Sequence, residues 1–266
     1  MLFPISCVSC EENDTWLCPD CFNKIEILSS QVCPYCEKNI TDRGETCPAC
    51  KNIFLGKNEA LPLDGLVSST SYNAGNISRL VHLFKYNFVS DIHFPLGKIL
   101  TAAILKNNLP IPNLIIPVPL HPRRLRWRGF NQAELLANRV SENLTPGFSI
   151  PVFPGLLIRQ KYTAAQMKIK NYKERQRNLK DAFTLVAPFS EEGHPMSKPR
   201  FLSLTWTSDV QVGAPSLSLE GKTVLLIDDI CTTGSTLFEC GKTLKQNGAK
   251  KVFAAVIARQ EIKKKI

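Results

Sequence analysis

The chain has 266 residues, of which 44% are apolar, so it is long enough for one α/β domain with a buried core and a small appendage. It has no apolar run near the roughly 18–20 residues that a membrane-spanning helix needs, and its first residues lack the basic and apolar regions of a signal peptide, so we expect a cytoplasmic protein without membrane insertion. The net charge of +10 is unevenly distributed: residues 1–55 hold four Lys or Arg against eight Asp or Glu, whereas the remaining residues hold 29 against 15. The positive charge of the larger part indicates phosphates as its partners.

Eight of the ten cysteines form four Cys-x-x-Cys pairs near the N-terminus. Each pair can turn both sulfurs toward one ion, and two pairs complete a tetrahedron. Sequential pairing predicts two structural zinc ions, with redox chemistry and an iron–sulfur cluster as the alternatives. The first predicted site is Cys7, Cys10, Cys18 and Cys21, and the second is Cys33, Cys36, Cys47 and Cys50. Four thiolates leave no open position for catalysis, which favours a structural role for the metal. The bound metal would stabilise a segment that is too short to build its own hydrophobic core.

Beyond the cysteines, apolar periodicity predicts an alternation of helices and strands. After a linker over residues 51–66, we expect amphipathic helices whose apolar positions repeat near residues 77–84, 96–103 and 133–140. Short strands are expected at residues 114–118, 152–158 and 182–186. Residues 187–219 are rich in Ser and Pro without a helical period, which predicts an irregular excursion.

The clearest unit comes last in the chain. A strand is expected at Thr223–Ile227, a loop at Asp228–Thr236, a helix to about Gln246, and a strand at Val252–Ile257. This order favours a parallel sheet with ligands at the carboxyl ends of its strands. N–H groups and hydroxyls at a helix N-terminus suit a phosphate, and two adjacent carboxylates suit the hydroxyls of a ribose. The alternative is a capped turn with solvated acids.

Two basic segments remain. Residues 121–130 carry four arginines and no acid, and residues 159–180 hold eight Lys or Arg against one Glu, with Tyr162 and Tyr172 between them. They could hold pyrophosphate, close as a lid or bind single-stranded nucleic acid by charge and stacking, and a solvated basic face is the alternative. The candidate nucleic-acid residues are Arg126, Arg128, Lys168 and Lys170. His121 beside Arg124 is either a phosphate ligand or a structural histidine, and Cys231 and Cys240 are expected to be buried apolar residues.

The string from Leu225 to Thr236 resembles the phosphoribosyl pyrophosphate motif of type I phosphoribosyltransferases. The whole chain is more closely similar to the ComF family of competence proteins. The segments that carry this resemblance are Leu2-Phe3-Pro4, the cysteine pairs, Leu83–Tyr86, Pro117–Pro122, Arg126–Gln132, Arg159 with Thr163 and Gln166, Arg175 with Asn178 and Leu179, Ala182-Phe183, and Ala258-Arg259.

The resemblance implies a type I phosphoribosyltransferase fold, a mainly parallel sheet flanked by helices, over residues 56–266, behind a double zinc-ribbon module over residues 1–55. Asp228 and Asp229 would be the catalytic pair, binding the ribose 2- and 3-hydroxyls directly or through Mg²⁺. The 5-phosphate would be bound by Thr232, Thr233, Gly234, Ser235 and Thr236, and the pyrophosphate by Leu120, His121 and Arg123. Thr232 stands where 6-oxopurine phosphoribosyltransferases place an aspartate, which argues against purine salvage.

Two functions follow from this reading. One is a phosphoribosyltransferase that binds Mg²⁺-phosphoribosyl pyrophosphate, or a related nucleotide, in DNA uptake and natural transformation. The other is a non-catalytic protein that binds single-stranded DNA and uses the fold as a scaffold. Proteins of the competence machinery are further expected partners. No residue identifies an acceptor for the phosphoribosyl group.

Overall fold

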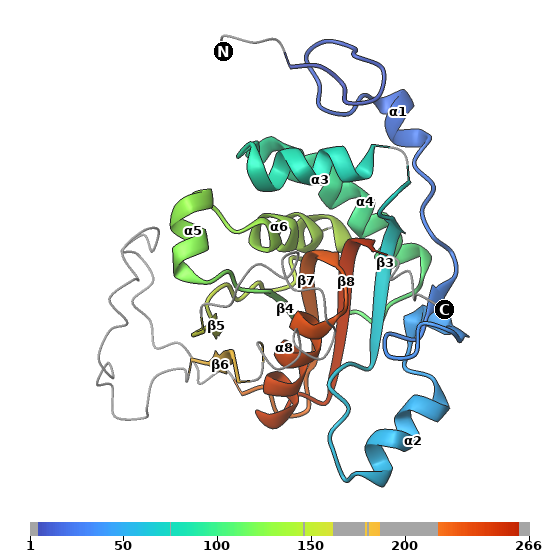
Figure 1. Cartoon of the computed structure of the whole chain (residues 1–266), viewed down its shortest axis with the longest axis vertical. Helices are drawn as coiled ribbons and strands as arrows, with labels where there is room; N and C mark the ends of the chain where they lie inside the picture. Colours follow the sequence, from blue (N-terminus) through green and yellow to red (C-terminus); the bar gives the residue numbers. More distant parts are fainter. Residues whose placement is uncertain are drawn as a thin grey trace.

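A four-stranded sheet forms the centre of the computed structural model, which describes residues 5–74, 76–145, 147–161, 179, 181–186 and 218–260 (Figure 1). The strands lie in the order β3 (Gly65–Ser71), β8 (Lys251–Arg259), β7 (Thr223–Cys231) and β4 (Leu114–Pro117). All three neighbouring pairs are parallel. The predicted parallel sheet is therefore confirmed, and the carboxyl ends of its strands meet at one edge.

Helices cover both faces of the sheet, as a parallel sheet requires. Leu225 and Ile227 of β7 join the core formed with α3 (Ile77–Tyr86), α4 (His93–Lys106) and α6 (Gln132–Leu144). Val224 and Leu226 point to the other face and join the core formed with α8 (Ser235–Gln246). A small antiparallel hairpin of β5 (Leu157–Arg159) and β6 (Phe183–Leu185) also packs on this second face. Because both faces of β7 are covered, its residues from Val224 to Ile227 are all apolar.

The cysteine-rich module lies against the sheet domain. It contains α1 (Pro19–Asn23), the antiparallel pair β1 (Gln31–Val32) and β2 (Ile40–Thr41), η1 (Asp42–Gly44) and α2 (Pro48–Gly56). The Gln31 side chain bonds both backbone groups of Ser68 in β3, accepting from its N at 2.9 Å and donating to its O at 3.1 Å. A Cβ on Gly44 would lie 2.0 Å from the Leu66 carbonyl oxygen, so only glycine allows this contact. The predicted boundary between residues 55 and 56 stays a prediction.

Several elements differ from expectation at places where sequence periodicity is weak. Helix α2 and the start of β3 occupy parts of the predicted linker. The Cys-x-x-Cys turn at the start of α2 and strand β3 both pack on parts of the chain that are distant in sequence. The basic segment after β4 contains α5 (Pro122–Arg128), which begins with proline and ends at Gly129 with φ +78°. The expected strand at residues 152–158 is a single bridge at Val152 followed by β5. A short 3₁₀ helix, η2 (Ser90–Ile92), precedes α4.

Strand β7 is longer than predicted at its carboxyl end. It continues to Cys231 because β8 keeps pairing with it, from Asp228 opposite Val256 to Cys231 opposite Arg259. The acidic pair therefore lies within the strand, and the loop begins only after Cys231. Lys168, Lys170 and most of the predicted excursion fall outside the described residues, whereas Leu219 at its end is buried in the core. Across the described ranges, no helix combines the length and apolarity needed to cross a membrane.

Candidate functional site

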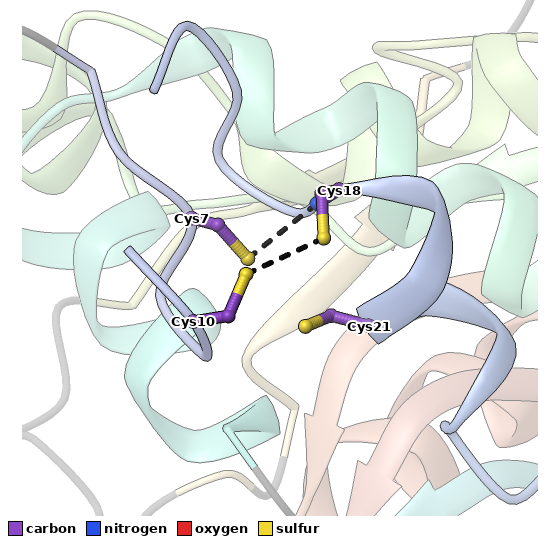
Figure 2. A group of neighbouring side chains, drawn as sticks. All are labelled: Cys7, Cys10, Cys18 and Cys21. Atoms are coloured by element: carbon purple, nitrogen blue, oxygen red, sulfur yellow. Dashed lines mark hydrogen bonds between the residues drawn. The ribbon is translucent and has the colours of Figure 1, made fainter. Parts of the chain in front are cut away.

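Two groups of four cysteines converge as the sequence predicts. In each group the Sγ atoms lie within 4.8 Å of one another, and Figure 2 shows the four sulfurs of the first group turned toward a common centre. A tetrahedron with Zn–S bonds of about 2.3 Å has edges of about 3.8 Å. The Cys10 and Cys18 sulfurs are 3.6 Å apart, and those of Cys36 and Cys47 are 3.8 Å apart. Both tetrads therefore fit zinc.

Backbone donors around the tetrads favour thiolates, the form that binds metal. The Cys18 N–H donates to Cys7 Sγ, and the Cys47 N–H donates to Cys33 Sγ. Burial raises the pKa of Cys7, but N–H donors from Cys18, Ser9 and Cys10 outweigh it and lower the pKa to about 6. Burial and the neighbouring Cys47 and Cys33 raise the pKa of Cys50, because thiolates this close repel one another. A divalent cation relieves this repulsion.

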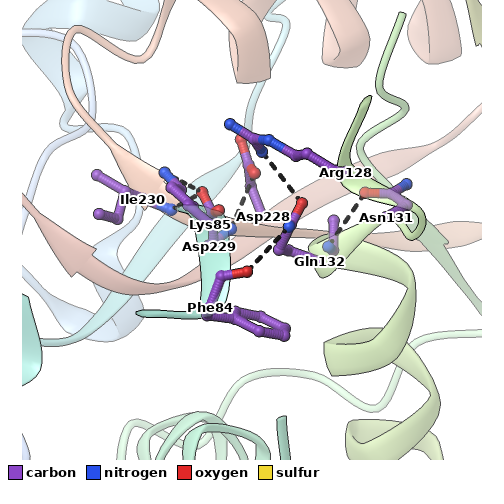
Figure 3. A network of polar contacts seen from close by, with 9 residues as sticks. Phe84, Lys85, Arg128, Asn131, Gln132, Asp228, Asp229 and Ile230 are labelled. Carbon is purple, nitrogen blue, oxygen red and sulfur yellow. Dashed lines mark hydrogen bonds and ion pairs between the residues drawn. The ribbon is translucent and has the colours of Figure 1, made fainter. Parts of the chain in front are cut away.

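The acidic pair lies at the carboxyl edge of the sheet, where its two side chains have different surroundings (Figure 3). Asp229 is buried and forms an ion pair with Lys85 near the end of α3, with Lys85 Nζ 2.9 Å from Asp229 Oδ1. Asp228 Oδ1 accepts a hydrogen bond from the Asp229 N–H at 2.8 Å. Burial and the adjacent Asp229 raise the pKa of Asp228 to about 7, although Lys85 lowers it. One of the two acids is thus paired with a lysine, and the pKa of the other is raised toward neutral pH.

The predicted phosphate loop joins β7 to α8. Gly234, with φ +73°, precedes the first residue of α8. The Thr233 and Ser235 hydroxyls are buried and lie 2.9 Å apart. Thr232, Gly234 and Thr236 line a small hollow together with Asp228. N–H groups at the start of a twelve-residue helix beside these hydroxyls can receive a phosphate.

A basic cluster faces the same edge from β5, α5 and the turn before α5. His121 caps α5, its Nδ1 accepting from the Arg123 N–H at 3.1 Å. Burial lowers the pKa of His121, and so do the charges of Arg159, Arg124, Arg126 and Arg123. Arg159 is itself buried, and its pKa is lowered by burial and by Arg124 and raised by Asp228. Several cations near one another and near Asp228 are suited to an anionic ligand.

A buried glutamine connects the helices around this edge (Figure 3). Gln132 Nε2 donates to the Phe84 carbonyl of α3 at 3.1 Å, and Gln132 Oε1 accepts from Arg128 Nη1 of α5 at 3.1 Å. Asn131 caps α6 and also donates to the Val118 carbonyl after β4. Arg128, a predicted nucleic-acid residue, is therefore partly structural.

Exposed aromatic rings lie next to the arginines of α5. Trp127 is 58% exposed, Phe88 45% and Tyr86 38%. Trp127 contacts both other rings edge to face, at centroid distances of 5.5 Å to Phe88 and 6.3 Å to Tyr86. Phe88 has φ +58°, a strained backbone conformation for an aromatic residue. Arg123 and Arg126 are exposed on α5, the helix that also carries Trp127. We call this group, Tyr86, Phe88, Arg123, Arg126 and Trp127, the aromatic–arginine surface.

The structure thus brings together Asp228, Asp229, the loop to Thr236 and the turn at His121. Two residues near this edge were not among the predicted site residues: Lys85, which forms an ion pair with Asp229, and Arg159, whose charge affects the pKa of His121 and is itself affected by Asp228. Both lie in segments that carry the family resemblance, and Arg159 also begins the basic segment 159–180.

Family models match the two parts of the chain. A model of the phosphoribosyl transferase domain matches residues 135–265, and a model of the double zinc ribbon domain matches residues 1–51. The chain combines a double zinc ribbon with a phosphoribosyltransferase domain. This confirms the predicted fold of the two parts.

Relatives match most of the chain. The DNA utilization protein YhgH of Salmonella typhi is 28% identical over 88% of this chain and 92% of that protein. Competence protein F of Haemophilus influenzae is 28% identical over 97% of this chain and 98% of that protein. A stretch of 48 residues is 42% identical to a ribose-phosphate pyrophosphokinase of Thermoplasma acidophilum, 18% of this chain and 17% of that one. The resemblance to competence proteins of the ComF type is confirmed.

Proposed function

We propose that the carboxyl edge of the sheet binds phosphoribosyl pyrophosphate with Mg²⁺. The observation that carries the proposal is the meeting of three chemistries at one edge: a carboxylate pair, a hydroxyl-lined helix N-terminus and a basic cluster. A phosphorylated ribose with a pyrophosphate at C1 needs these three. The short match to a ribose-phosphate pyrophosphokinase supports the same ligand class.

Each part of the ligand has a proposed partner. Asp228 and Asp229 would hold the ribose 2- and 3-hydroxyls and the magnesium ion, whose preferred ligands are carboxylate oxygens. The loop from Thr232 to Thr236 would bind the 5-phosphate through N–H groups and hydroxyls. Leu120, His121 and Arg123 would bind the pyrophosphate, and we add Arg159 to this set because it lies near both His121 and Asp228.

The chemistry of such a site is mainly electrostatic. When the C1–O bond to pyrophosphate breaks and an acceptor bonds to C1, negative charge grows on the leaving pyrophosphate and positive charge on the ribose. Arg159 and Arg123 would stabilise the first charge, and the carboxylates would stabilise the second. Bound Mg²⁺ would supply further charge neutralisation at the pyrophosphate. Among the described residues, no side chain at this edge identifies the acceptor, so binding is the proposal and transfer is its extension.

Calorimetry with phosphoribosyl pyrophosphate tests the binding site. We expect wild type to bind in a Mg²⁺-dependent way and Asp228→Asn with Asp229→Asn to bind about a hundredfold or more weakly, because two charge-assisted contacts are lost. Sulfate should still bind the loop of this variant, whereas Thr236→Val should weaken both ligands. Gly234→Val is a poor probe, since a Cβ there would lie 2.8 Å from the Phe238 ring. Wild type that shows no Mg²⁺-dependent binding at millimolar ligand would refute the proposal.

The aromatic–arginine surface supports a second function, the binding of single-stranded DNA. Exposed rings stack on bases of any sequence, and neighbouring arginines neutralise phosphates. Trp127 and Phe88 offer the rings, and Arg123 and Arg126 offer the charges. The names of the relatives, a DNA utilization protein and a competence protein, agree with such a partner.

Binding of an oligothymidylate, followed as a function of salt, tests this second function. Trp127→Ala should weaken binding about fivefold to a hundredfold, the effect of one lost stacked base. Arg126→Glu should weaken binding and reduce its salt dependence. Phe148→Ala is the matched control, because Phe148 is also an exposed aromatic residue, at 66%, but lies after α6. Equal affinities of the Trp127 and Phe148 variants would exclude the surface as the DNA site.

A further inference from the structure

The second cysteine tetrad lies against the back of the predicted phosphate loop. Tyr35, between the cysteines of the knuckle Cys33–Cys36, stacks on Phe238 of α8, with ring centroids 4.6 Å apart and planes inclined by 12°. The Phe238 ring in turn packs under Gly234, where a Cβ would lie 2.8 Å from its nearest atom. A continuous stack therefore runs from the knuckle through one ring of α8 to the backbone of the loop.

A second contact joins the same knuckle to the beginning of the loop. Arg259, at the end of β8, donates from Nη2 to the Pro34 carbonyl at 3.1 Å and to Glu37 Oε1 at 2.9 Å. Arg259 is paired in the sheet with Cys231, the residue directly before the loop. The knuckle thus contacts Arg259, which pairs with Cys231 before the loop, and Phe238, which packs under Gly234 at its end.

Tyr35 has its own position fixed on further sides. Its hydroxyl accepts a hydrogen bond from the Leu63 N–H at 2.9 Å, and the Phe54 ring of α2 meets it edge to face at 4.9 Å. Its backbone lies between two predicted zinc ligands. The first tetrad packs elsewhere, against α3, where Arg79 donates to the Val8 carbonyl. The two metal sites therefore have different neighbours.

We infer that Tyr35 is a positioning residue for the phosphate loop and that zinc at the second tetrad fixes the position of Tyr35. The part of this inference that concerns ligand affinity rests on the proposed phosphoribosyl pyrophosphate site. Rigid loops bind more tightly because less ordering remains for the ligand to impose. A stacked aromatic pair corresponds to about a three- to tenfold effect on an equilibrium.

Amide hydrogen exchange without any ligand tests the inference directly. In Tyr35→Leu, peptides covering residues 231–236 should exchange about three- to tenfold faster than in wild type, while the variant still holds two zinc ions. Tyr35→Phe keeps the ring stack and should restore wild-type exchange in the loop. Phe238→Leu removes the same stack from the other side without changing any residue of the zinc module and should match Tyr35→Leu. The matched control is Phe22→Leu, an aromatic residue of α1 beside the first tetrad, which should leave the loop unchanged.

Ligand binding provides the second measurement. Tyr35→Leu should bind Mg²⁺-phosphoribosyl pyrophosphate about three- to tenfold more weakly than wild type, and Phe22→Leu should bind equally well. The inference is wrong if exchange at residues 231–236 is the same in wild type, Tyr35→Leu and Phe238→Leu. Absence of ligand binding in wild type instead refutes the proposed function, and the exchange measurement still decides whether the knuckle positions the loop.

Discussion

Replacing Asp228 with asparagine should stabilise the protein above neutral pH. The asparagine Oδ1 can still accept the hydrogen bond from the Asp229 N–H, so the change removes mainly a charge. A folded pKa of about 7 in place of the ordinary 3.8 means that ionisation of this carboxyl opposes folding. The folded state holds the proton between these two pH values while the unfolded state has lost it. Wild type therefore loses stability as the pH rises from about 4 to about 7.

The full pKa difference corresponds to about 4 kcal/mol. Because part of the Asp228 side chain reaches solvent and its charge is coupled to Asp229 and Lys85, we expect about 2 kcal/mol at pH 8. The neighbouring Asp229→Asn should act in the opposite direction, lowering stability by about 1–2 kcal/mol, because it leaves Lys85 without its carboxylate at a partly buried position.

Urea denaturation at pH 6 and pH 8.5 measures both effects. Comparing each variant with wild type at the same pH cancels the acid lability of the zinc sites. The gain for Asp228→Asn should be smaller at pH 6 than at pH 8.5. The reasoning fails if Asp228→Asn is less stable than wild type at pH 8.5, or if both asparagine variants shift stability in the same direction.

Three further predictions concern other parts of the molecule. Cys33→Ser should lower the zinc content from two ions per chain to one, measured by metal analysis, and an iron–sulfur chromophore in wild type would contradict the zinc assignment. Lys85→Met should raise the pKa of Asp228 above about 7, since Lys85 lowers this pKa; an unchanged pKa in an NMR titration of the carboxyl groups would contradict this. Gly97→Ala should cost about 1–3 kcal/mol of unfolding free energy, because the added Cβ would lie 2.6 Å from Arg139 Cβ between α4 and α6, and a thermal midpoint equal to that of wild type would contradict this.

The sequence alone determined features that depend on near neighbours in the chain. The cysteine pairs predicted both tetrads, because a knuckle brings two sulfurs together within four residues. Apolar repeats predicted α3, α4 and α6, and the string from Thr223 to Gln246 predicted a strand, a loop and a helix in that order. Helix periodicity and knuckle geometry are local properties, so they can be read without the fold.

Only the tertiary structure decided contacts between segments far apart in sequence. The end of β7 depends on its pairing with β8, which carried the strand past Asp228 to Cys231. The ion pair of Lys85 with Asp229 and the stack of Tyr35 on Phe238 each join residues from distant segments. No local pattern encodes such pairs, because the folded sheet and the packing of the zinc ribbon against it bring them together.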